Sequence, residues 1–150
     1  MWADTLQVAE RLHFLRLCLW GALATLAGTA LFVLAYVRAE RPALLRRFAL
    51  VCGLLGLTEL LIGLVAYRVV PLRDIAAATR LDRFAWLQLG LYLGMTVAGV
   101  TFALASRVKK LASSGLAETS LARIGAGVAV ALHGLALATL ELLLIADVSR

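Results

Sequence analysis

Four long apolar runs, each bounded by charged residues, divide this chain. They cover residues 17–37, 48–67, 84–106 and 124–146. Each has about the 20 residues that a helix rising ~1.5 Å per residue needs to cross a hydrocarbon core about 30 Å thick. The sequence therefore predicts an all-α integral membrane protein, a four-helix bundle with short loops that forms a single domain over residues 1–150.

The composition agrees with a membrane location. Hydrophobic residues make up 63% of the chain, well above the share expected of a soluble globular protein. The formal net charge of +6 could indicate nucleic-acid binding, but the Lys and Arg residues lie between the apolar runs and form no concentrated basic patch. We therefore expect the lipid bilayer, and not nucleic acid, as the partner of this surface.

Four spans place the N- and C-termini on the same side of the membrane. Lys and Arg are divided almost evenly between the two sides, with the denser clusters in the first and third loops. This density weakly favours a cytoplasmic position for those loops and leaves room for insertion in both orientations, as an antiparallel dimer would require. The predicted location is a bacterial cytoplasmic (inner) membrane.

Two stretches outside the apolar runs also have helical spacing of their apolar residues. Residues 2–13 fit either a short interfacial helix on the membrane surface or an amphipathic lead-in to the first span. The alanine-rich segment 71–83 fits an interfacial helix that leads into the third span.

Two ionisable side chains lie near the middle of apolar runs. Glu59 is just past the centre of the second run and His133 just before the centre of the fourth. Because these two spans run in the same direction, the residues differ in depth by only ~5 Å, and Glu141 lies about 9 Å from the midplane toward one surface. Glu59 is therefore bracketed in depth by His133 and Glu141. A polar layer at this depth would also include Thr25, Tyr92 and Thr96.

A charged group that faced lipid at this depth would cost several kcal/mol, so Glu59 is expected to point inward, to be protonated or to be paired. His133 is the expected partner. One interpretation makes Glu59, His133 and Glu141 a proton relay or coupling site, which intramembrane ionisable residues often form. The other is structural, with a neutral Glu59 hydrogen-bonded to His133, Tyr92 or a backbone carbonyl to fix the packing of the helices.

Small residues at spacings of three and four predict where the helices approach one another. In lipid, close packing and a few polar contacts hold helices together. The third run offers two such stripes, one through Tyr92 and Thr96 and one through the glycines. The predicted packing glycines are Gly21, Gly28, Gly56, Gly63, Gly90, Gly94, Gly127 and Gly134.

The positions of the Cys, His and hydroxyl residues argue against several specific kinds of site. Cys18 and Cys52 fall on opposite sides of the midplane, roughly 20 Å apart in depth, which argues against a disulfide. His13 precedes the first run, so a haem held by two histidines of this chain is not expected, and too few ligands share one level for zinc or copper. The hydroxyl residues of the third loop have no His or Asp around them to suggest nucleophilic catalysis. We expect no enzyme activity, no cofactor and no bound metal.

These observations favour a non-catalytic polytopic protein, an accessory or scaffold subunit of a larger membrane complex or a homo-oligomer. The small-residue faces exceed what one bundle needs, and the short loops leave no soluble domain for an active site. The alternatives are a small dimeric proton-coupled transporter that uses Glu59 with His133, and a pigment- or haem-binding subunit that uses His133. In size and in its central glutamate the chain resembles the small multidrug resistance transporters in outline. Those carry their essential glutamate in the first helix and not the second, so no residue role is carried over.

Overall fold

The computed structural model describes the whole chain except residues 1, 38–42, 72–73, 113–116 and 149–150. The described residues form four helices and no strand: α1 (Trp2–Val37), α2 (Ala43–Arg68), α3 (Ile75–Ala112) and α4 (Ala117–Val148). All four are long and apolar enough to cross a membrane. The predicted all-α four-helix bundle is confirmed, and the protein is a multi-pass membrane protein.

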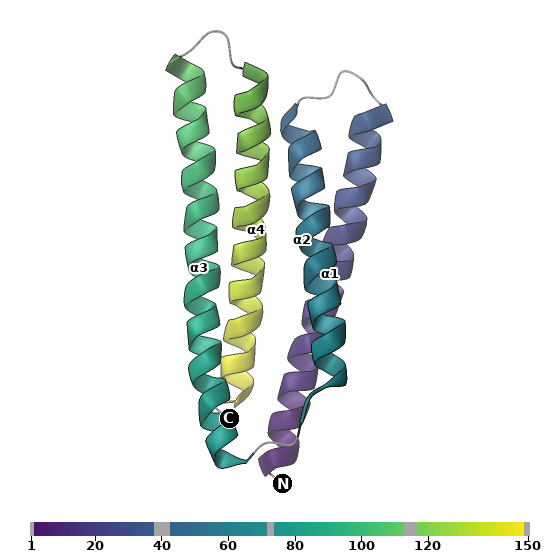
Figure 1. Cartoon of the computed structure of the whole chain (residues 1–150), viewed down its shortest axis with the longest axis vertical. Helices are drawn as coiled ribbons and strands as arrows, with labels where there is room; N and C mark the ends of the chain where they lie inside the picture. Colours follow the sequence, from purple (N-terminus) through teal and green to yellow (C-terminus); the bar gives the residue numbers. More distant parts are fainter. Residues whose placement is uncertain (1, 38–42, 72–73, 113–116, 149–150) are drawn as a thin grey trace.

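The helices form two antiparallel hairpins that meet along α2 and α4 (Figure 1). The first hairpin is α1 with α2, and the second is α3 with α4. α4 also contacts α1, whereas α3 packs chiefly on α4. The Trp2 end of α1 and the Val148 end of α4 lie at the same end of the bundle. α4 is therefore the central helix, and α3 is the one with the largest free surface.

Large apolar side chains cover the outside of the bundle. Leu26, Leu87 and Leu91 are each about 70% exposed. The buried core consists mostly of small residues, with Ala24, Cys52 and Ala129 at its centre. This inverted distribution suits a protein whose solvent is hydrocarbon, because lipid tails are as apolar as leucine.

The N-terminal stretch continues the first span without a break. α1 begins at Trp2 and runs for 36 residues, and Glu10 and His13 within it are buried. Residues 2–13 are therefore a lead-in to the first span that packs within the protein, and the alternative of a separate surface helix is not what the structure shows.

The third span likewise starts earlier than its apolar run. α3 begins at Ile75, where the N–H of Ala77 donates to Oδ1 of Asp74 at 2.7 Å. An aspartate in this position caps a helix by satisfying one of its unpaired N–H groups. Residues 75–83 of the segment expected to form an interfacial helix are thus the first turns of a 38-residue helix about 57 Å long. Residues 72–73 of that segment lie outside the described part of the chain.

Glycines mark the closest approaches within each hairpin. A Cβ added to Gly21 would lie 2.5 Å from the backbone N of Leu60, and one added to Gly134 would lie 2.7 Å from the backbone N of Thr96. These distances leave room for hydrogen only. The predicted packing glycines at such contacts are Gly21, Gly28, Gly56, Gly63, Gly127 and Gly134.

Gly90 and Gly94 do not take part in these contacts, because no atom of the described chain lies within 4 Å of a Cβ added to either one. α3 faces α4 through the other stripe, since Tyr92 and Thr96 lie against Gly134. With the Tyr92 and Thr96 stripe of α3 against α4, Gly90 and Gly94 face outward, and both are exposed.

Candidate functional site

Glu59 and His133 meet between the two hairpins. Nδ1 of His133 lies 2.7 Å from Oε1 of Glu59, and Nε2 lies 3.4 Å from Sγ of Cys52. Cys52 and Glu59 are seven residues apart on α2 and so share one face, about 10.5 Å apart along the axis. The imidazole of α4 bridges these two turns. His133 is fully buried, and Glu59 is 7% exposed.

The contact distances define a linear hydrogen-bonded chain. If the N–H is on Nδ1, His133 donates to the Glu59 carboxylate and Nε2 can accept the weak S–H of Cys52. If Glu59 is protonated instead, its O–H donates to Nδ1. When Glu59 is protonated and the neutral imidazole carries its N–H on Nε2, the carboxyl proton can pass to Nδ1 and give a carboxylate–imidazolium pair without any change in the packing of the helices.

The side chains around Glu59, His133 and Cys52 are apolar, apart from a few buried polar atoms that have no hydrogen-bond partner among the described residues. The ring of Trp20 meets that of His133 edge to face, with centroids 5.6 Å apart. Among the described residues, neither Trp20 Nε1 nor Glu59 Oε2 has a hydrogen-bond partner, although both are buried. A buried polar atom in this state destabilises a fold by ~1–3 kcal/mol.

The order of Cys52, His133 and Glu59 also matches that of nucleophile, base and orienting acid in hydrolases. Two features oppose that chemistry here. Cys52 is only 5% exposed, beneath Ala24 and Ala129. The backbone N–H groups around it are committed to the helix and cannot form an oxyanion hole.

A second buried group lies nearer the end of the bundle that holds the ends of α1 and α4. Nε2 of His13 lies 3.7 Å from Oε2 of Glu141, and both residues are buried together with Glu10. Arg16 donates to Asp147 at 2.9 Å in a partly exposed ion pair. All of these contacts join α1 to α4.

Sequence reasoning placed His13 outside the first span, because Arg16 ended the apolar run. The spacing of Leu6, Ala9, His13 and Leu17 at three and four residues was the available signal, and all four are buried. Cys52 was not included in the predicted site, although its seven-residue separation from Glu59 places both residues on one helical face.

The titratable side chains form a ladder along the bundle. On α4 the order from Val148 inward is Asp147, Glu141 and His133. Asp147 pairs with Arg16, and Glu141 lies beside His13. Glu59 and Cys52 of α2 both contact His133. His133 and Glu141 are eight residues apart on α4, about 12 Å. Along the bundle axis, His133 lies between Cys52 and Glu59. The axial separation of Glu141 and Glu59 is therefore shorter than 12 Å, roughly 7 Å. Tyr92 of α3 is within electrostatic reach of both carboxyl groups.

The side chains of the predicted polar layer make their hydrogen bonds within their own helices. The Thr25 hydroxyl donates to the Gly21 carbonyl at 2.7 Å, and that of Thr96 donates to the Tyr92 carbonyl at 2.9 Å. Threonine in a helix often bonds the carbonyl four residues back, which satisfies it without a tertiary partner. The Tyr92 hydroxyl accepts from Gln88 at 3.4 Å, so none of the three is hydrogen-bonded to Glu59 or His133.

The ladder is one-sided. Beyond Cys52, toward the first and third loops, the only buried polar side chains among the described residues are Ser106 and Ser120. The Ser106 hydroxyl bonds the carbonyl of Phe102 in its own helix. Buried ionisable groups therefore connect the centre of the bundle with only one of its ends.

Neither a metal cluster nor a disulfide is built into the described part of the chain. It holds no group of three or more His, Cys, Asp and Glu side chains arranged to bind a metal ion, and Cys18 and Cys52 are both free thiols. Comparison of the chain with protein-family models, with curated proteins and with solved structures finds no match.

Proposed function

We propose that this protein is a non-catalytic subunit of a membrane assembly, either a homo-oligomer or a complex with other membrane chains, in a bacterial cytoplasmic membrane. The observation that carries the proposal is the outward face of α3, where Gly90 and Gly94 are exposed and contact no other helix of the described chain. α3 packs chiefly on α4, so this face is free along the bundle.

Small residues on a lipid-facing surface suit contact with another helix. Lipid tails gain little from a surface of glycine, whereas a second helix can approach its backbone closely and gain dispersion and Cα–H contacts. Gly21 and Gly134 show how this chain uses glycine inside its own bundle. Gly90 and Gly94 have the same four-residue spacing without a partner in the chain.

The test is the native mass of the protein extracted in mild detergent, compared with that of Gly90→Leu/Gly94→Leu. We expect an oligomer, or stable co-purifying chains, from the native protein and their loss in the variant. Ala30→Leu is the control, because it adds a side chain to an exposed small residue of α1. A monomer without partners, or an unchanged assembly in the variant, would refute the proposal.

A second candidate, a small proton-coupled transporter, is favoured by the one-sided ladder. Glu59 and His133 can share one proton, and His13 with Glu141 lies between them and one end of the bundle. Buried ionisable groups in this arrangement are typical of proton pathways. The central pair would load and release the proton that drives transport.

Proton movement can be followed in liposomes with an internal pH-sensitive dye and an imposed pH gradient. Glu59→Gln should abolish the flux, because an amide cannot carry the proton, while Thr58→Val, one residue away on the exposed side of α2, should leave it intact. Flux that survives Glu59→Gln, or none from the native protein, would eliminate this candidate.

The geometry gives no support to a pigment or haem ligated by His133. Its two ring nitrogens already face Glu59 and Cys52, and Trp20 lies against the ring. Axial ligation would require one nitrogen to leave its partner in a site with no exposed surface.

A further inference from the structure

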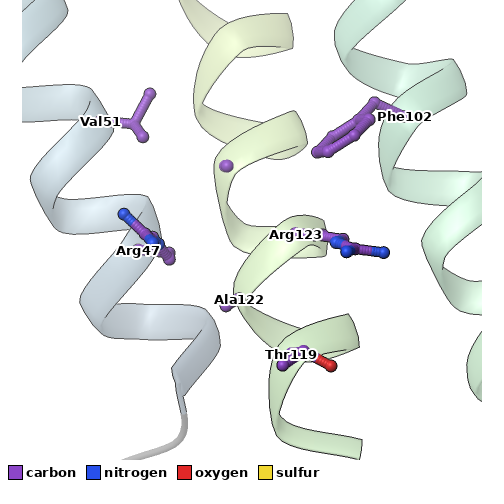
Figure 2. A pocket seen from close by; sticks show the side chains of 7 residues that line it. Arg47, Val51, Phe102, Thr119, Ala122 and Arg123 are labelled. Atoms are coloured by element: carbon purple, nitrogen blue, oxygen red, sulfur yellow. The ribbon is translucent and has the colours of Figure 1, made fainter. Parts of the chain in front are cut away.

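A pocket of about 410 Å³ lies at the end of the bundle where α2 and α4 begin. Its polar lining comes from Arg47 of α2 and from Arg123 and Thr119 of α4, and its apolar lining includes Val51 and Phe102. Figure 2 shows the two arginines at nearly the same level on neighbouring helices, with Val51 and Phe102 farther into the bundle. We propose that this pocket binds an anionic phospholipid, with its phosphate at the level of the two arginines.

The depth of the pocket fits a lipid headgroup. Arg47 immediately precedes the apolar run that starts at residue 48, and Arg123 immediately precedes the run that starts at residue 124. Both guanidinium groups therefore lie at the boundary between hydrocarbon and headgroups, where lipid phosphates are found. Nearby, a Cβ added to Gly125 would clash with the carbonyl of Leu44, so the backbones of α2 and α4 almost touch.

The charged side chains that line the pocket are both positive. No acidic side chain among the described residues forms an ion pair with Arg47 or Arg123. The N-termini of α2 and α4 lie at the same end and add the positive ends of two helix dipoles. Among the described residues, the acid at this end is Glu118 in the first turn of α4, which is exposed and does not line the pocket. Planar guanidinium groups bind phosphate oxygens in a bidentate manner.

The apolar wall distinguishes a phospholipid from a soluble phosphate. Val51, Phe102 and Ala126 continue the pocket from the arginines toward the hydrocarbon. A free phosphate would gain nothing from these side chains, whereas the first methylenes of an acyl chain would bury apolar area against them. The lining comes from α2 of the first hairpin and from α3 and α4 of the second. A lipid bound here would hold the hairpins together at the end opposite the titratable ladder.

The assignment also bears on orientation. Anionic lipids give the cytoplasmic leaflet its negative surface potential. A pocket for an anionic headgroup among the first and third loops therefore agrees with the cytoplasmic position that their denser basic residues favour.

The experiment is native mass spectrometry of the purified protein titrated with phosphatidylglycerol, with phosphatidylcholine and with inorganic phosphate, together with thermal unfolding. We expect retained phosphatidylglycerol and a raised melting temperature with that lipid only. Arg47→Gln/Arg123→Gln should weaken its binding by roughly tenfold or more. Arg80→Gln/Arg83→Gln, which removes the same charge from exposed sites on α3, should not.

A second variant keeps the test decisive if the first disturbs folding. Ala126→Leu leaves both arginines in place and fills the space along the apolar wall of the pocket. This substitution by itself should weaken the binding of phosphatidylglycerol. Equal binding of phosphatidylcholine, equal losses in the two double-arginine variants, or stabilisation by inorganic phosphate to the same degree would each overturn the assignment.

Discussion

Nδ1 of His133 on α4 lies 2.7 Å from Oε1 of Glu59 on α2, and this contact joins the two hairpins at the centre of the bundle. Because α3 packs chiefly on α4, the hairpins depend on α2, α4 and α1 for their association. The pair is therefore both a tertiary contact and the innermost step of the titratable ladder.

Trp20 should report its contact with His133. In a variant with Trp2→Phe and Trp86→Phe, Trp20 is the one remaining tryptophan. Its ring meets that of His133 edge to face, with centroids 5.6 Å apart. Because His133→Leu replaces the imidazole beside the indole with an aliphatic group, we predict that it shifts the emission spectrum of Trp20. Identical spectra with and without the substitution would show that the two rings do not meet.

Glycine substitutions should separate internal contacts from the free face. Gly21→Ala places its Cβ 2.5 Å from the backbone of Leu60, which cannot yield as a side chain could, so we expect destabilisation by about 1–3 kcal/mol. Gly94→Ala meets nothing in the chain and should leave the stability of the monomer unchanged. Reversible unfolding in mixed micelles measures both. Equal losses in the two variants would contradict the packing described.

The two cysteines should differ in reactivity. Cys52 is buried beside His133, whereas Cys18 is partly exposed. With the other cysteine replaced by alanine, we predict that a membrane-permeant maleimide labels Cys18 in the folded protein and labels Cys52 only after unfolding in SDS. Rapid labelling of Cys52 in the native protein would contradict this prediction. It would show that reagents reach the centre of the bundle and would support a chemical role for the Cys52 thiol.

Much of this arrangement could be predicted from sequence, because depth along a membrane helix follows from residue counting. Glu59 and His133 fall near the centres of runs that cross in the same direction, and they do meet. The rotation of each helix about its axis could not be read in the same way. α3 carries two small-residue stripes of similar quality, and the choice of the Tyr92 stripe over the Gly90 stripe is made by tertiary packing against α4.

The start of the first span was harder to predict for a related reason. A charged residue ended the apolar run at Arg16, yet Arg16 pairs with Asp147 and the helix continues through His13. Flanking charges locate membrane boundaries only when they face water. Cys52 could have been added to the site from its spacing to Glu59, but its hydrogen-bonding role required the position of the imidazole.

A double-mutant cycle between Glu59 and His133 in lipid bicelles tests the central contact most directly. Glu59→Leu, His133→Leu and the double variant would be unfolded reversibly and their free energies of unfolding compared. We predict a coupling of about 1 kcal/mol or more, above the ~0.6 kcal/mol typical of hydrogen bonds between membrane helices, because both partners are almost fully buried. Losses that simply add, with coupling below about 0.3 kcal/mol, would show that the two side chains do not interact in the membrane.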